Sequence, residues 1–118
     1  KGNGDRKFTE DVYYNTGLAI YSIAFEGARL AIKNSGWPLT PDKIKAGLES
    51  LKNYNANGLI APITVTAQDH GGGGKTRIEM WDGEKWDAQT DWIAGFQDDV
   101  WSVVKEQSAD FAKSETQK

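Results

Sequence analysis

The feature that most constrains this chain is a helical apolar pattern that begins near Thr9 and runs to about Asn34. Two apolar stripes follow the helical repeat. They comprise Tyr14, Leu18, Tyr21, Phe25, Ala28 and Ile32, and Tyr13, Gly17, Ile20, Ala24, Gly27 and Ala31. A helix with so little polar surface has to be covered on most sides, and its small residues permit another backbone to approach closely. We therefore predict a long buried helix with Thr9 as its N-cap.

A second helix is predicted after the Gly36 break. Thr40 followed by Pro41 is typical of an N-cap and a first helical residue. Ile44 and Leu48 then fall on one face, and the apolar spacing continues to about Lys52. This pattern predicts a helix that is shorter than the first and apolar on one side.

The next segments favour β structure. Residues 60–67 are typical of a short strand that is interrupted by Pro62, which has no N–H group to donate. Around Gly83 we predict a hairpin with a three-residue loop at 81–83, which would place Ile78 opposite Trp86.

A last helix is expected after Asp98 and Asp99, because acidic residues suit a helix N-terminus. The element order is then helix, helix, strand, hairpin, helix. One strand and a hairpin cannot cover a long helix that is apolar on most sides. The pattern therefore predicts that the isolated chain lacks packing partners and forms a homo-oligomer that buries this helix.

Composition excludes several functions. The 118 residues carry a net charge of -3 without a conspicuous run of Lys or Arg, so we expect no nucleic-acid partner. The absence of cysteine rules out disulfides and thiolate chemistry. We also expect no cofactor, because no motif for one is recognisable.

His70 and the glycines at 71–74 are candidates for a reactive or phosphate-binding loop. A metal site or a catalytic base needs further partners at suitable spacing, and none is visible around His70. A phosphate loop is followed by a helix, whereas the segment after residue 74 is typical of a strand. We therefore favour a turn role for His70 and a flexible connection at 71–74, and we predict no catalytic residue, no metal site and no enzymatic activity.

Aromatic residues give the remaining candidates. Trp81, Trp86, Trp92 and Trp101 could stack on sugars, although tryptophan in a short hairpin more often fills a core, which is the role we favour. Tyr13 and Tyr14 open the first helix, where a helix N-terminus attracts anions and tyrosine offers a ring and a hydroxyl group. They are the candidate ligand-binding residues, with packing on a sheet as the alternative.

Taken in order, six motifs resemble the C-terminal part of the branched-chain amino-acid type (type I) of periplasmic substrate-binding protein of ABC transporters. They are Tyr14-Asn15-Thr16-Gly17, Leu39-Thr40-Pro41-Asp42-Lys43-Ile44, Gly58-Leu59-Ile60-Ala61-Pro62, Asp69-His70, Met80-Trp81-Asp82-Gly83-Glu84-Lys85-Trp86 and Thr90-Asp91-Trp92. The resemblance implies an α/β fragment of a two-lobed fold over residues 1–118. Residues from about 9 to 58 would form the helical part of one lobe. Residues from about 59 to 118 would form the crossover strand, hairpin and final helix of the other.

The same resemblance implies a function. The parent would be an extracytoplasmic or periplasmic solute-binding component of an ABC importer. It would bind an amino acid or an aromatic or aliphatic carboxylate, with Tyr13 or Tyr14 at the cleft, and deliver it to an ABC permease. Most ligand contacts would lie upstream of Lys1. The alternative is a Trp-rich module that binds carbohydrate or another protein.

Overall fold

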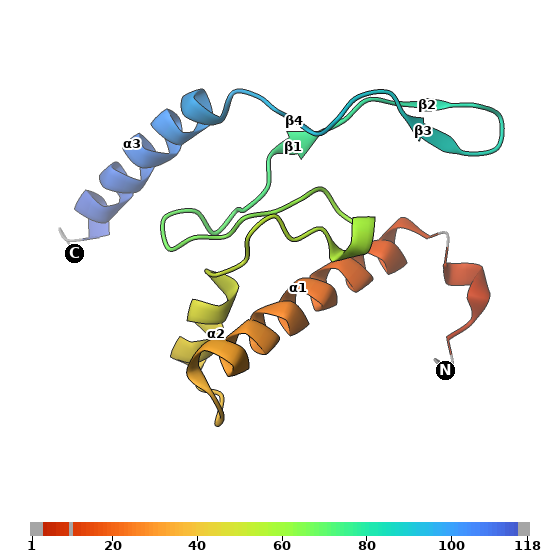
Figure 1. Ribbon diagram of the computed structural model, residues 1–118. Coiled ribbons are helices and arrows are strands. Elements are labelled where there is room, and N and C mark those ends of the chain that lie inside the picture. Colours follow the sequence, from red (N-terminus) through yellow and green to blue (C-terminus); the bar gives the residue numbers. More distant parts are fainter. Residues whose placement is uncertain (1–3, 10, 116–118) are drawn as a thin grey trace. The chain divides into compact units, whose positions relative to one another are not determined.

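The structure is a computed structural model that describes residues 4–9 and 11–115. The chain divides into two compact units, residues 1–73 and 74–118. The first contains η1 (Arg6–Phe8), α1 (Val12–Ser35), α2 (Pro41–Leu48) and η2 (Ala56–Gly58). The second contains β1 (Lys75–Thr76), β2 (Glu79–Trp81), β3 (Trp86–Ala88), β4 (Ile93–Ala94) and α3 (Gln97–Glu115) (Figure 1).

The described part is thus mixed α and β, with two small antiparallel sheets. The units divide after residue 73, later than the boundary that the sequence suggested at about residue 58. Whether they belong to two lobes of a type I binding fold stays a prediction. No helix within 4–9 and 11–115 is both long and apolar enough to cross a membrane.

The N-terminus of α1 is capped by Asp11, so the prediction of Thr9 as the cap is wrong. The Asp11 carboxylate accepts hydrogen bonds from the N–H groups of Tyr13 and Tyr14, at 2.7 and 3.3 Å. Thr9 instead donates its hydroxyl hydrogen to the carbonyl of Arg6, at 2.8 Å, at the end of η1. Asp11 lies within hydrogen-bonding distance of two N–H groups that have no acceptor inside the helix, and this geometry decides where the helix begins.

The signals at the end of α1 and the start of α2 are confirmed. Gly36 follows α1 with a φ of 70°, which favours glycine. The Thr40 hydroxyl oxygen accepts a hydrogen bond from the Lys43 N–H, at 3.3 Å, as an N-cap does. The helix ends at Leu48, before the predicted limit at Lys52, because the chain tightens there into a turn.

Close packing of α1 on α2 is made possible by small residues. Gly27 and Ala31 are the buried residues of α1, and Gly47 is the buried residue of α2. A Cβ atom added to Gly47 would overlap the carbonyl oxygen of Gly27 and lie 2.8 Å from the Ala31 nitrogen. The prediction that the small-residue stripe admits another backbone is therefore confirmed.

The other stripe of α1 is exposed, which agrees with the prediction that this chain by itself cannot cover a helix that is apolar on most sides. Tyr21 and Phe25 are 66% and 72% exposed. In the described residues the buried apolar side chains are Ala31 and Leu51. The first unit offers α2 and loops, which cover one side of α1 and leave the opposite stripe without a packing partner there.

The predicted strand at 60–67 is absent from the described structure, apart from one isolated bridge. Three successive N–H groups donate alternately to carbonyl groups in two separate segments, residues 51–54 and residue 72, so no ladder with a single neighbour forms. The bonds run from Ile63 to Tyr54 at 2.9 Å, from Thr64 to Gly72 at 3.0 Å and from Val65 to Leu51 at 3.0 Å. The segment is a loop that ties the unit together.

The hairpin is present, but its predicted register is wrong. Trp81 lies opposite Trp86, in place of the predicted Ile78. The loop spans residues 82–85, because the Asp82 carboxylate accepts hydrogen bonds from the N–H groups two and three residues further on, both at 2.8 Å. This local turn sets the register.

The tryptophans of the second unit are not in a core, contrary to the prediction. Trp81 and Trp86 are 51% and 64% exposed, with ring centroids 5.6 Å apart. The guanidinium of Arg77 lies over the ring of Trp92, 4.5 Å from its centroid. A two-stranded ribbon has no second layer to bury these rings, so they contact near neighbours along the chain instead.

Candidate functional site

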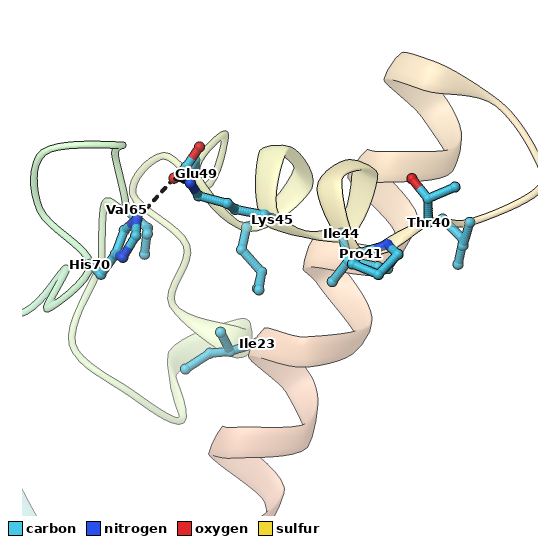
Figure 2. Close-up of a pocket in the computed structure, with 10 residues that line it drawn as sticks. Ile23, Thr40, Pro41, Ile44, Lys45, Glu49, Val65 and His70 are labelled. Carbon is cyan, nitrogen blue, oxygen red and sulfur yellow. Dashed lines mark hydrogen bonds and ion pairs between the residues drawn. The ribbon is translucent and has the colours of Figure 1, made fainter.

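A groove of about 800 Å³ lies beside α1 and α2 in the first unit. Figure 2 shows side chains that line it. They are Ile23, Leu39, Thr40, Pro41, Ile44, Lys45, Leu48, Glu49, Val65 and His70.

The walls of the groove are apolar and half-buried. Ile44 and Leu48 lie one turn apart on α2, so both project from the same face. Ile23 comes from α1, and Val65 comes from the loop that was predicted to be a strand. Such walls suit an apolar group, since they offer few hydrogen-bonding partners.

Charged groups lie at one end of the groove. The Glu49 Oε1 atom is 2.8 Å from Nε2 of His70 and 3.8 Å from Nζ of Lys45. The His70 side chain is 60% exposed and that of Glu49 is 19% exposed. Exposed pairs of this kind contribute little to stability.

The turn role assigned to His70 belongs to its neighbour. The carboxylate of Asp69 accepts hydrogen bonds from the N–H groups of Gly71 and Gly72, at 2.8 and 3.1 Å. Backbone N–H groups of a glycine-rich loop are what an incoming phosphate would need. Here an internal carboxylate already occupies them, which agrees with the expectation that 71–74 is a connection.

Tyr13 and Tyr14 lie in the first turn of α1 and do not line the groove. Tyr13 is 83% exposed and Tyr14 is 43% exposed. Their N–H groups are occupied by Asp11, so the anion-attracting amides invoked from the sequence already have an anionic partner. A ligand-binding role for these tyrosines stays a prediction that rests on their rings and hydroxyl groups.

The ion pair between Glu26 and Arg29 on α1 shifts the pKa values of both residues. Arg29 donates two hydrogen bonds to the carboxylate of Glu26, at 2.7 and 2.6 Å. These bonds lower the pKa of Glu26, and they raise the pKa of Arg29. Neither residue lines the groove.

Across the part of the chain that the structure describes, no cluster of three His, Asp or Glu residues is arranged to hold a metal ion.

Sequence reasoning did not identify the groove. The spacing of Ile44 and Leu48 was recognised as an apolar helix face, but it was interpreted as a packing surface. Val65 and His70 reach the groove because the 54–72 loops fold back through hydrogen bonds between distant residues. No sequence period encodes such a return of the chain.

The comparisons with known proteins correct the family assignment. No family model matches the chain, and no curated protein matches it significantly. A solved structure described as an ABC transporter permease from the Pseudomonas fluorescens group matches 95% of the chain, with a TM-score of 0.76 and 33% sequence identity. The chain spans 29% of the length of that protein.

This match overturns two conclusions drawn from the motifs. The similar protein is described as a permease, so the identification as a periplasmic substrate-binding protein is wrong, and so is the solute-binding function derived from it. The match supports the association with ABC transport and leaves the periplasmic and branched-chain amino-acid assignments without support.

Proposed function

We propose that this chain is part of an ABC transporter protein related to the matched permease, and that its role in transport is non-catalytic. The observation that carries the proposal is the similarity over 95% of the chain, at 33% identity. Sequence identity at this level says more about function than a shared fold alone does, because one fold serves many functions.

The groove supports the non-catalytic part of the proposal. Its walls are supplied by apolar side chains such as Ile44 and Leu48, and its polar end holds the pair of Glu49 and His70. The apolar side chains give the groove its shape and could contact an apolar group bound there. An extracytoplasmic location and a contact with a permease stay separate predictions, which cell fractionation and cross-linking would test.

A deletion experiment tests the transport role. The coding region for the chain would be removed from its gene and restored with the wild type or with Gly47→Val, which disrupts the packing of α1 on α2. Energised uptake would be measured for radiolabelled amino acids, organic acids and sugars. We expect the deletion to abolish uptake of at least one solute, and the wild type, but not Gly47→Val, to restore it.

The control is Gly17→Ala, because a Cβ atom at Gly17 meets nothing within 4 Å. This variant should restore uptake as the wild type does. Unchanged uptake of every solute after the deletion, with loss of the product verified by immunoblot, would refute the transport role.

A further inference from the structure

Residues 53–58 form a loop whose backbone has a positive φ angle at four positions. They are Asn53, Ala56, Asn57 and Gly58, at 49°, 48°, 57° and 92°. Glycine, and to a lesser extent asparagine, tolerates such angles, whereas alanine is strained there by its Cβ atom. Opening of the loop therefore relieves strain at Ala56.

Asn57 directly precedes Gly58 in this loop, and it is exposed. Its side-chain amide makes no hydrogen bond within the part of the chain that the structure describes. The Gly58 N–H donates to the Asn55 carbonyl, at 3.0 Å, and this bond closes the single turn η2. Figure 1 shows η2, in green, beside α1. An unpaired amide thus lies on the surface, next to a short turn.

An asparagine that precedes glycine lies next to its own nucleophile, because no side chain shields the glycine nitrogen. The Gly58 nitrogen forms a bond to Cγ of Asn57, and solvent carries its proton to the side-chain nitrogen, which leaves as ammonia. The resulting five-membered imide takes up a water molecule at either of its carbonyl groups. Ring opening then gives aspartate or, where the chain continues through the side chain, isoaspartate. Water is the co-reactant, and no atom is oxidised or reduced.

The second loop with this dipeptide pattern, Asp82 followed by Gly83, is built differently. The Asp82 carboxylate accepts hydrogen bonds from the N–H groups of Glu84 and Lys85, both at 2.8 Å. These bonds favour the ionised carboxylate, which is a poor electrophile, since ring closure there has to expel water from the protonated acid. They also hold the side chain away from the Gly83 nitrogen. The turn therefore protects Asp82, whereas the amide of Asn57 is uncharged and has no such partner.

We propose that Asn57 is a site of spontaneous modification in the folded chain, where it converts through a cyclic imide to aspartate and isoaspartate, and that Asp82 is protected by its turn. The ring closes only after η2 opens, because the Gly58 N–H is held by Asn55. Exposed turns open at little free-energy cost, and this one relieves strain when it does. The product carries a new negative charge, and isoaspartate lengthens the backbone, so the bonds that Asn55 accepts from Gly58 and Ile60 are disrupted.

Peptide mapping tests the proposal, because trypsin separates the two sites. Cleavage after lysine and arginine places Asn57 on peptide 53–75 and Asp82 on peptide 78–85. The 118-residue chain would be incubated in mildly alkaline buffer, both folded and unfolded in guanidinium chloride. Isoaspartate would be counted by enzymatic methyl transfer, and tandem mass spectrometry would assign each modified residue.

Folding should slow the conversion of Asn57 by less than about tenfold, since the exposed turn opens readily. It should slow the isomerisation of Asp82 by a larger factor. Asn3, which lies outside the described residues and also precedes a glycine, falls on peptide 2–6 and is measured separately. An unmodified Asn57 in the folded chain, or stronger protection of Asn57 than of Asp82, would overturn the proposal.

Two glycine variants locate the reacting residue. Asn57→Gly removes the amide at a φ angle that glycine accepts, so peptide 53–75 should lose the conversion while circular dichroism shows unchanged helix content. The matched control is Asn53→Gly, which makes the same change at a φ angle of 49° and should convert as the wild type does. Conversion that persists at the wild-type rate in Asn57→Gly would place the reaction at another asparagine and refute the assignment.

Discussion

The two units of the chain are stabilised over different sequence distances. In the first, the Tyr54 hydroxyl donates to the carbonyl of Ser22, at 3.2 Å, and Gly47 packs on the backbone of Gly27. In the second, β1 pairs with β4 and β2 pairs with β3, and both pairs are nested around the 82–85 loop. A change in the first unit should therefore separate whole elements, whereas a change in the second should act on one hairpin.

The same side-chain motif occurs in both units and shows what context adds. Asp69 and Asp82 each accept hydrogen bonds from the N–H groups two and three residues further on. The Asp69 turn leads into Gly72, which is buried and bonded to Thr64. The Asp82 turn closes an exposed hairpin. Identical local chemistry therefore stabilises a tertiary contact in one unit and a local turn in the other.

The largest effect is expected for Gly47→Ala. The added methyl group would overlap the carbonyl oxygen of Gly27, and backbone cannot move aside as a flexible side chain can. Overpacking of this kind costs about 1–3 kcal/mol. Urea unfolding monitored by circular dichroism would measure the loss.

Gly17→Ala is the matched control for that prediction. It makes the same substitution in a helix where the new methyl group meets nothing within 4 Å. Alanine is the better helix former, so stability should rise by about 0.5–1 kcal/mol. Equal loss of stability in both variants would show that the close approach of α1 and α2 is not what makes Gly47 necessary.

Smaller losses of stability, different in size, are expected for alanine substitutions of Asp69 and His70. Asp69→Ala leaves the N–H groups of Gly71 and Gly72 without their acceptor and should cost about 1 kcal/mol, the net value of typical hydrogen bonds. His70→Ala removes an exposed partner of Glu49 and should cost less, within about 0–1 kcal/mol. Unfolding by urea would rank the two variants, and a larger loss for His70→Ala would reverse the assignment of the turn role.

The contrast between the units also explains what the sequence could predict. The Gly36 break, the Thr40 cap and the small-residue contact at Gly27 were all predictable, because each depends on a residue and its near neighbours along a helix. Pro41 reinforced the start of α2 for the same reason. In contrast, the strand predicted at 60–67 depended on a partner strand that the described structure does not supply.

The candidate site was the least predictable part. Tyr13 and Tyr14 were chosen for the start of their helix, yet Asp11 already satisfies the N–H groups there. The groove forms where Val65 and His70 come beside α2, and that depends on hydrogen bonds between segments far apart in sequence. Periodicity identifies one face of one element and does not reveal which loop will cover it.

The smallest predicted effect is a pH dependence confined to the hairpin. The N–H groups of Lys85 and Glu84 donate to the Asp82 carboxylate and hold its pKa below the ordinary value of 3.8. A carboxyl group with a lowered pKa in the folded state stabilises the fold above its unfolded pKa, and this contribution is lost as pH falls through the folded pKa. The turn should therefore loosen only below about pH 4.

The readout is the near-ultraviolet circular dichroism of the Trp81 and Trp86 pair, whose rings lie 5.6 Å apart across the hairpin. Acid titration should weaken this signal in the wild type below about pH 4, while the helical signal near 222 nm, a standard far-ultraviolet band, changes less. Asp82→Asn keeps an acceptor oxygen that does not titrate, so its hairpin signal should stay level over the same range. If both proteins lose the signal together, the acid effect arises elsewhere in the chain, and the hairpin is not governed by its own local turn.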